Sequence, residues 1–431
     1  MRGLPVALVV LIVGSAVVLR VGDRRMIPTR NCADGLASSA ELRGYTVPPA
    51  ASGPPPLRAT RIDEPAAVSR GTRMFHGDAE HTHRSTARGP KHARAAWRTA
   101  LGAGIAAQVV TSADESVLYA GTLGGDLVAL DAAGGKEKWR VALAGDAALG
   151  AGDKSKAPRV YATPCVGDDG TIFVASDAKW AFAVSAAGKI TAKYETGEEG
   201  DTAVSCGKYG VIVAAGRFVT TLSSRLDLLS RVKVDGKVYS APIVAGDLIV
   251  FGSQSDRLYG ARNGQIAWSA DLGGDVDASP VAAADGSFWV GTDKGEVVHV
   301  SHDGHVVSRT DVGGFVRGSL TLAKNGDVLA GTYGPVPRVV RVKPDGTLSE
   351  ALTLTGTGSK DFGVHGSPLE AADGVLYFGA QDDAAYGVGY DGELLFRYAT
   401  KGDVDAPLTL LADGTLLVPS EDGTLSALRD P

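Results

Sequence analysis

The chain repeats a four-strand pattern at intervals of about 40 residues, and this repeat limits the possible folds more than any other feature. In the clearest unit, apolar segments at 276–281, 287–292 and 295–300 and one after Gly304 are separated by Asp-Gly, Lys-Gly and Asp-Gly turns. Such dipeptides supply the positive φ angle that tight hairpins require. Each unit is therefore predicted to be a four-stranded antiparallel meander.

The glycine of the first turn recurs along the chain, and its spacing counts the units. Steps of 40, 36, 40, 40, 48 and 40 residues separate Gly170, Gly210, Gly246, Gly286, Gly326, Gly374 and Gly414. An earlier unit, 116–143, has the same strands without that glycine. The last unit has only three strands, and Ala96–Thr99 is predicted to add the fourth and close a ring. These features predict an all-β, eight-bladed β-propeller, with seven blades as the alternative if the weak unit at 203–235 is not a blade.

Composition agrees with many strands and tight turns and excludes several classes of protein. Glycine accounts for 57 of 431 residues, while 44% of the chain is hydrophobic and 21% charged, which excludes wholesale disorder. The chain has 43 Lys and Arg against 49 Asp and Glu, a balance that does not suit a phosphate backbone. We therefore expect no nucleic-acid partner, and we expect a monomer.

The first 72 residues differ from the rest of the chain. The apolar run Leu4–Leu19, 16 residues long, is short for a membrane span of about 20 residues and fits a signal-peptide core or a marginal anchor. Residues 1–25 are interpreted as a signal peptide or N-terminal membrane anchor, although the arginines that follow the run favour the opposite orientation. Residues 26–72 contain seven prolines and are predicted to be a disordered linker to a propeller at 73–431. We expect an exported protein, periplasmic or anchored in the cell envelope.

One segment carries a resemblance to a known family. Ala129–Trp139 reads Ala-x-Asp-x-x-x-Gly-x-x-x-Trp, and Gly264–Trp268 repeats the second half of that pattern. The pattern resembles the tryptophan-docking repeat of pyrroloquinoline-quinone (PQQ)-type propellers, and the stretch Phe75–Trp97 is similar to their usual lead-in. The resemblance covers about residues 73–431. It implies that Trp97, Trp139 and Trp268 are structural and pack between neighbouring blades.

The PQQ-like family includes catalytic quinoproteins and non-catalytic scaffolds. In the catalytic members, the resemblance implies PQQ above a tryptophan and beneath a disulfide of adjacent cysteines, with a bound Ca²⁺. This sequence has no adjacent cysteine pair and few insertions, so we expect no catalytic residues, cofactor or metal, with PQQ and Ca²⁺ as the alternative. The chain most resembles the PQQ-repeat scaffold of the bacterial outer-membrane barrel assembly machinery, which implies a protein-binding scaffold.

Aligning the units isolates one variable position. Each first strand is predicted to open as apolar-x-small-small-Pro or a variant, and x should lie at one mouth of the central channel. Its side chains would form a ring that binds a protein partner or a small molecule or glycan, that serves a quinoprotein oxidoreductase, or that is only a solvated rim. The ring comprises Tyr161, Thr202, Tyr239, Asp277, Arg317, His365 and Asp405.

Two further groups of residues have alternative interpretations. Cys165 and Cys206 occupy near-equivalent positions in adjacent units and could form a disulfide, although equivalent strands of neighbouring blades tend to lie beyond disulfide reach. Otherwise they would be separate buried thiols. Histidines crowd the lead-in at His76, His81, His83 and His92. They could bind zinc, but loop histidines without cysteines or patterned carboxylates are usually solvated.

Overall fold

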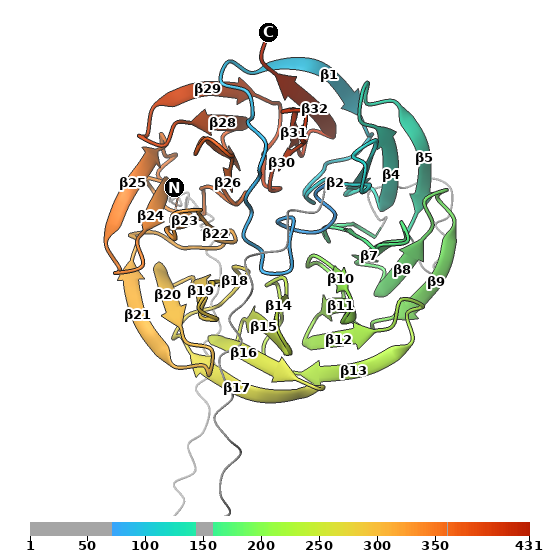
Figure 1. The fold of residues 1–431 in the computed structure, drawn as a ribbon, viewed down its shortest axis with the longest axis vertical. Coiled ribbons are helices and arrows are strands. Elements are labelled where there is room, and N and C mark those ends of the chain that lie inside the picture. The colour runs from blue at the N-terminus through green and yellow to red at the C-terminus, as the bar shows by residue number, and fades with distance from the viewer. Residues whose placement is uncertain (1–70, 144–157, 360) are drawn as a thin grey trace, which may run out of the picture. The chain divides into compact units, whose positions relative to one another are not determined.

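Eight four-stranded antiparallel sheets form a closed ring in the computed structural model, which describes residues 71–143, 158–359 and 361–431 (Figure 1). The eight-bladed propeller is thereby confirmed, and the weak unit at 203–235 is the third blade. The predicted signal peptide or anchor and nearly all of the predicted linker lie outside the described residues. Within the described ranges, no helix is long and apolar enough to cross a membrane.

Each blade begins with a short innermost strand and ends with the outermost one. The first four blades are β2 (Val110–Thr111), β3 (Val117–Gly121), β4 (Asp126–Asp131) and β5 (Glu137–Ala142); β6 (Cys165–Val166), β7 (Ile172–Ser176), β8 (Trp180–Val184) and β9 (Ile190–Glu195); β10 (Ser205–Gly207), β11 (Gly210–Ala215), β12 (Phe218–Leu222) and β13 (Leu228–Lys233); and β14 (Ile243–Ala245), β15 (Leu248–Ser253), β16 (Arg257–Arg262) and β17 (Gln265–Asp271).

The next three blades repeat this order, and the eighth takes its outermost strand from the other end of the domain. They are β18 (Val281–Ala282), β19 (Phe288–Gly291), β20 (Glu296–Val300) and β21 (Val306–Asp311); β22 (Thr321–Leu322), β23 (Val328–Gly331), β24 (Arg338–Val342) and β25 (Leu348–Thr353); β26 (Leu369–Glu370), β27 (Leu376–Ala380), β28 (Ala384–Val388) and β29 (Leu394–Ala399); and β30 (Thr409–Leu410), β31 (Leu416–Pro419) and β32 (Thr424–Arg429), completed by β1 (Arg94–Ala100).

The N-terminal strand closes the ring, as the sequence predicts. β1 pairs antiparallel with β32, with Trp97 opposite Ala427, and the two strands lie side by side in Figure 1. The last blade therefore contains both ends of the propeller, and its sheet gains a complete outer strand. This pairing covers the edge of β32 that a three-stranded last blade would leave open, and it joins the start of the propeller to its end.

Apolar side chains between neighbouring blades form the core. The second and third strands are nearly continuous apolar runs, such as β7, in which every residue is buried, because a blade packs against a neighbour on each face. The outer strands alternate in exposure, as in β9, because one of their faces contacts solvent. Eight buried clusters result, and each joins two adjacent blades around the ring.

The three tryptophans named above lie on glycine turns of the following blade. Trp139 lies over Gly188, and its Nε1 donates a hydrogen bond to the carbonyl of Ala186 at 2.9 Å. Trp268 covers Gly304 in the same way. Trp97 covers Gly135 across the closure and donates from Nε1 to the carbonyl of Ala132 at 3.2 Å. Each of these contacts joins the outermost strand of one blade to a turn of the next blade, although no backbone ladder connects the two sheets.

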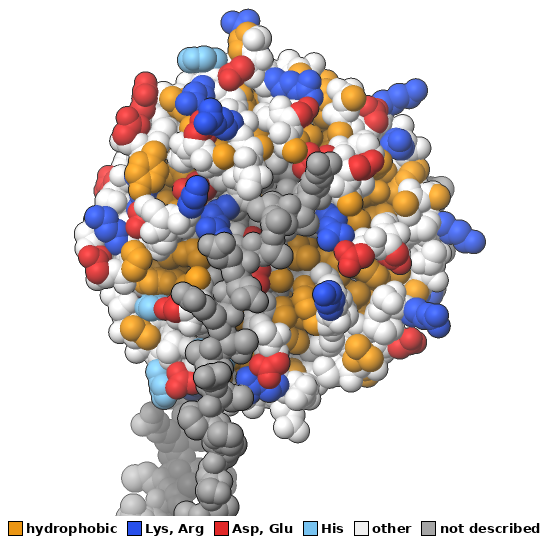
Figure 2. Space-filling view, in the orientation of Figure 1, with side chains coloured by type: hydrophobic (Ala, Val, Ile, Leu, Met, Phe, Trp, Pro, Cys, Tyr) orange, Lys and Arg blue, Asp and Glu red, His pale blue; other side chains and the backbone are white. Residues whose placement is uncertain are grey.

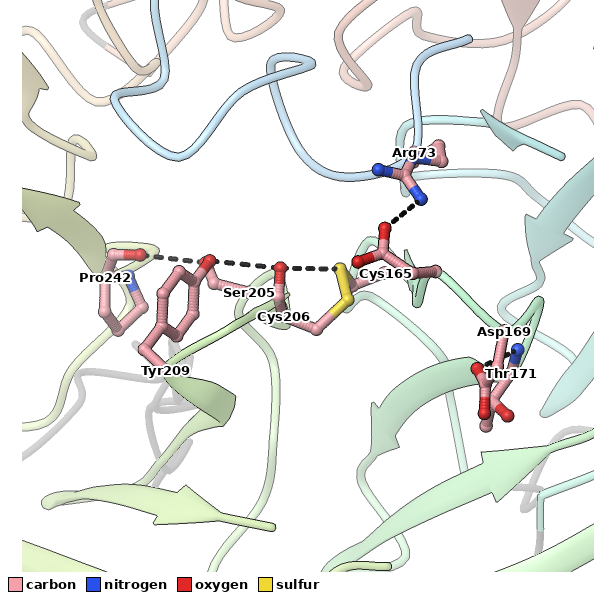
Figure 3. Close-up of a disulfide and its surroundings, with 9 residues drawn as sticks. Arg73, Cys165, Asp169, Thr171, Ser205, Cys206, Tyr209 and Pro242 are labelled. Carbon is pink, nitrogen blue, oxygen red and sulfur yellow. Dashed lines mark hydrogen bonds and ion pairs between the residues drawn. A yellow bond between two sulfur atoms is a disulfide. The ribbon is translucent and has the colours of Figure 1, made fainter. Parts of the chain in front are cut away.

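A disulfide joins the second and third blades at their innermost strands (Figure 3). Cys165 of β6 and Cys206 of β10 are bonded, and both are buried within the apolar cluster between these blades. The expectation that such strands lie beyond disulfide reach is wrong. Innermost strands converge toward the propeller axis, and the two Cα atoms are 5.9 Å apart, inside the usual range for a disulfide.

Replacing Gly188 by alanine should destabilise the propeller more than the same change at Gly170. Both glycines have φ near +80°, so both variants incur the left-handed strain, about 1 kcal/mol. A Cβ at Gly188 would lie 2.7 Å from Trp139, whereas at Gly170 the nearest atom is 4.0 Å away. We expect Gly188→Ala to cost a further ~1–3 kcal/mol through overpacking, measured by denaturant unfolding. Equal losses in the two variants would show that tryptophan docking does not stabilise the interface.

Candidate functional site

All seven predicted ring residues line one cavity at the mouth of the central channel. The cavity has a volume of about 450 Å³. Each blade contributes the residue at the same position of its repeat, and Ala106 is the equivalent residue of the first blade, which the sequence comparison missed. The ring residues in the lining are Tyr161, Thr202, Tyr239, Asp277, Arg317, His365 and Asp405.

The ring residues lie in the connections that precede the innermost strands rather than in the strands themselves. The sequence places Val276–Val281 in a strand, but β18 begins only at Val281. A proline before that strand has no N–H to donate to a ladder. The other backbone groups bond to the next blade instead, as where Ser279 N–H donates to Ser319 Oγ at 3.1 Å. The ring is therefore held by contacts between blades.

A second set of side chains, which we call the supporting ring, positions the first. Its members are Asp177, Gln254, Asp293, Tyr333 and Gln381. Each follows a second strand and contacts a residue of the following blade: Gln254 Nε2 donates to Asp277 at 3.4 Å, and Gln381 Nε2 donates to Asp405 at 3.2 Å.

Two further contacts extend this pattern. Arg317 Nε donates a hydrogen bond to Asp293 Oδ2 at 3.1 Å. The hydroxyl of Tyr333 is hydrogen-bonded to Nδ1 of His365 at 2.6 Å. The supporting ring was not predicted, although the sequence carries a signal for it: each member follows a small residue and then a Ser, Thr or Ala.

The lead-in segment closes the end of the channel opposite the mouth. Its backbone carbonyls accept hydrogen bonds from the innermost strands of six blades, including Thr72 from Thr111 N–H at 2.8 Å and Ala79 from Val244 N–H at 3.1 Å. Figure 1 shows the segment in blue across the centre of the ring. Phe75 packs against Ala203 and Ala241 and forms part of the cavity lining. Among the described residues, the lead-in therefore closes the cavity at the end opposite the mouth.

Three lead-in histidines are buried in this closure, which corrects the expectation that they are solvated. His76, His81 and His83 are each at most 1% exposed, whereas His92 is exposed. The rings of His76 and His83 stack with centroids 4.1 Å apart, and neither nitrogen of His81 has a hydrogen-bond partner. Within the described ranges, no group of three or more His, Cys, Asp or Glu side chains is arranged to hold a metal ion.

Burial sets the protonation of these histidines. It lowers the pKa of His81 to about 3 and that of His83 to about 4, and His83 contributes further to the shift at His81. The pKa of His76 is also lowered well below 6.5, mainly by burial and secondly by His83. The closure is therefore built from neutral rings at neutral pH.

Carboxyl groups dominate the charge of the mouth. Burial raises the pKa of Asp277 to about 6, and Asp293 adds to the shift. Burial also raises the pKa of Asp201 to about 8, with contributions from its hydrogen bond to Asp177 and from Glu199. Burial together with Asp405 raises the pKa of Glu421. On the face shown in Figure 2, by contrast, acidic and basic side chains are interspersed among those drawn in colour.

Two cavity residues break the repeat pattern and escaped the sequence analysis. Asp201 occupies a position where the equivalent residues, such as Val160 and Val238, are buried aliphatics. Glu421 belongs to the position of the supporting ring but lines the cavity itself, beside the small Ala106. Asp201 could have been found as a charged residue at an otherwise apolar position of the repeat.

Comparison with known proteins identifies relatives of this architecture. A family model described as outer membrane protein assembly factor BamB matches residues 86–238 and 257–357. The solved structure of BamB from Moraxella catarrhalis is similar, with a TM-score of 0.61 and 16% identity over 78% of this chain and 97% of that one. No curated protein sequence matches the chain.

Two dehydrogenase structures are also similar. The quinohemoprotein alcohol dehydrogenase of Comamonas testosteroni has a TM-score of 0.65 and 13% identity over 84% of this chain and 81% of that one. A europium-containing methanol dehydrogenase has a TM-score of 0.61 and 11% identity over 81% and 89%. At such identities, these likenesses and that to the Moraxella structure establish the fold alone.

Replacing His81 by asparagine should reduce the loss of stability in acid. In the unfolded chain the pKa of His81 is about 6.5, whereas in the folded protein it is about 3. As the pH falls between these values, the unfolded state gains a proton that the folded state does not bind, so the free energy of unfolding decreases. One such histidine lowers the free energy of unfolding by about 2 kcal/mol at pH 5 relative to pH 8. Asparagine does not titrate and tolerates the φ of +58° at this position.

The measurement is denaturant unfolding of the wild type and His81→Asn at pH 8 and pH 5. Carboxyl groups with raised pKa, such as Asp277, shift stability in the opposite sense in both proteins, so the difference between proteins is the informative quantity. His305→Asn, at an exposed side chain, is the control and should follow the wild type. An identical pH dependence in all three proteins would contradict the role of buried His81.

Proposed function

Because the chain belongs to the BamB-like family of PQQ-repeat propellers, we propose that it is a non-catalytic scaffold of the bacterial cell envelope that binds a protein partner at its channel mouth. The observation that carries this proposal is the convergence of variable side chains from the blades on one blind cavity. The flanking positions repeat because packing requires it. The side chain at the variable position is not fixed by packing, so it can be selected for contact with a ligand, as in other repeat proteins.

Export is supported by two features of the chain. The apolar run Leu4–Leu19 fits a signal peptide or anchor. The buried disulfide between Cys165 and Cys206 fits an oxidising compartment, because thiols in the bacterial cytoplasm are kept reduced. We therefore place the propeller outside the cytoplasm, in the periplasm or anchored at the envelope.

The mouth does not suit PQQ, the cofactor that the wider family suggests. PQQ carries three carboxylates, whereas Asp277, Asp405 and Glu421 line this cavity and would repel them. The one arginine of the lining, Arg317, already contacts two carboxylates. The disulfide joins separate blades instead of adjacent residues. These observations favour a binding role over a quinoprotein activity.

Reversing two charges of the ring should release the partner without unfolding the propeller. In an affinity pull-down with quantitative mass spectrometry, we expect the double variant Asp277→Lys/Arg317→Glu to retain the partner at about one tenth of the wild-type amount or less. The matched control is Asp247→Lys/Arg262→Glu, which reverses an exposed ion pair at the opposite end of the fourth blade. Circular dichroism melting checks that both variants fold.

The informative comparison is among proteins retained by the wild type and by the control. A protein that both retain and the ring variant loses supports the mouth as the partner site. If the folded ring variant retains the same proteins in the same amounts, the mouth is not the partner site and the proposal is wrong.

PQQ with Ca²⁺ should leave the thermal midpoint of the protein unchanged. A ligand present at 100 times its Kd would stabilise the fold by about 2.7 kcal/mol and raise the midpoint visibly. The measurement is thermal unfolding of the full chain with and without both additives. A Ca²⁺-dependent rise would contradict the non-catalytic proposal and favour the quinoprotein alternative.

A further inference from the structure

The channel cavity contains carboxyl groups that have no cationic partner. Asp201, Asp277, Asp405 and Glu421 line it, and none of them forms an ion pair with any residue in the described parts of the chain. They come from different connections around the mouth and face one shared space. Asp201, whose pKa is raised to about 8, is mostly protonated at neutral pH, so Asp277, Asp405 and Glu421 supply the negative charge of the cavity, where low-dielectric walls strengthen its field.

The cations near the mouth do not balance this charge. Arg317 lines the cavity, but its guanidinium lies 3.1 Å from Asp293 and 3.4 Å from Asp361, neither of which belongs to the lining. Arg159 and Lys237 lie against the rings of Tyr161 and Tyr239 and are also outside the lining. Arg317 and Arg159 partly oppose the raised pKa of Asp277 and Glu421 but form no ion pair with them, so a positive charge from outside the chain would meet an acidic site that is only partly compensated.

Buried hydroxyl groups lie in the same cavity and supply the second, independent observation. Ser367 is 2% exposed, lines the cavity, and forms no hydrogen bond within the described residues. The Oγ atoms of Ser279 and Ser319, 3% and 8% exposed, each accept one backbone N–H and keep a second lone pair. The Oδ1 atoms of Asp277 and Asp405 are also buried without a hydrogen-bond partner among the described residues, which is costly unless a ligand or water bonds them.

Neighbouring carboxyl groups also disfavour the ionised form of two of the cavity's acidic residues. The pKa of Asp277 rises to about 6, mainly through burial and then through Asp293, and burial followed by Asp405 raises that of Glu421. A ligand cation in the cavity would remove part of this repulsion, whereas an anion would increase it. The acceptor oxygens and the phenol rings of Tyr161 and Tyr239 suit an ammonium or guanidinium group.

We propose that the channel cavity receives lysine or arginine side chains from a basic, extended segment of the partner protein. This inference rests on the proposed function and specifies the chemistry of that partner. The carboxylates of Asp277 and Asp405 accept charge-assisted hydrogen bonds from the entering group. The hydroxyls of Ser279, Ser319 and Ser367 accept further bonds deeper in the cavity, and a volume of about 450 Å³ admits more than one side chain.

The test measures binding of a fluorescent hexalysine peptide to the full-length protein by anisotropy. We expect saturable one-to-one binding that weakens as salt is added, and no binding of hexaglutamate. Asp277→Asn and Asp405→Asn each remove charge with little change in shape and should weaken binding about fivefold or more. Ser367→Ala should weaken it less. Asp247→Asn removes an exposed carboxylate at the opposite end of its blade and should bind as the wild type does.

Each other outcome overturns part of the inference. Equal binding by all variants would mean that hexalysine contacts the general surface. Absence of binding would overturn the cationic chemistry. The scaffold proposal would still stand if the Asp277→Lys/Arg317→Glu variant releases a partner, so the two failures are distinguishable. Displacement of hexalysine by spermine at equal amine concentration would support the cationic site but overturn a protein segment as its source.

Discussion

The apolar contact between neighbouring blades is the interaction on which the rest of the structure depends. No blade can bury both faces of its sheet alone, and each does so only against the next one, so the eight clusters stabilise the ring together. β1 makes the arrangement circular by completing the last blade. The disulfide between the second and third blades links two members of the same ring and adds a covalent connection to one of these interfaces.

Ring closure also creates the candidate site, because a closed set of blades leaves a channel that side chains alone must fill. At one end the lead-in fills it with Phe75 and three neutral histidines bonded to the innermost strands. At the other end the blades supply the ring and the supporting ring, and a cavity remains. The contents of the channel thus differ at its two ends, although each blade follows the same pattern. This difference leaves a cavity at one end of the channel and a closure at the other.

The sequence predicts what repeats and fails where the chain departs from its repeat. Blade number, closure by Trp97 and its neighbours, and the alignment of seven ring positions all follow from the 40-residue period. The burial of His81 does not, because the lead-in has no periodic signal and its surroundings are strands far away in the chain. The length of β18 was overestimated because a proline removes a ladder donor and the next blade supplies alternative partners. The roles of Asp201 and Glu421 depend on positions that the alignment treated as uniform.

Asp201 shows why departures from the repeat are informative. Its equivalents are buried aliphatics that pack between blades, and a carboxyl group there loses that packing and is partly desolvated. The propeller would be more stable with valine at this position, since burial and Asp177 already disfavour the charge. Asp201 opposes the packing rule of its repeat position at the wall of the channel cavity, and this points to a demand other than stability. The acidic character of the mouth is therefore not explained by how the ring folds, and it agrees with the proposed binding role.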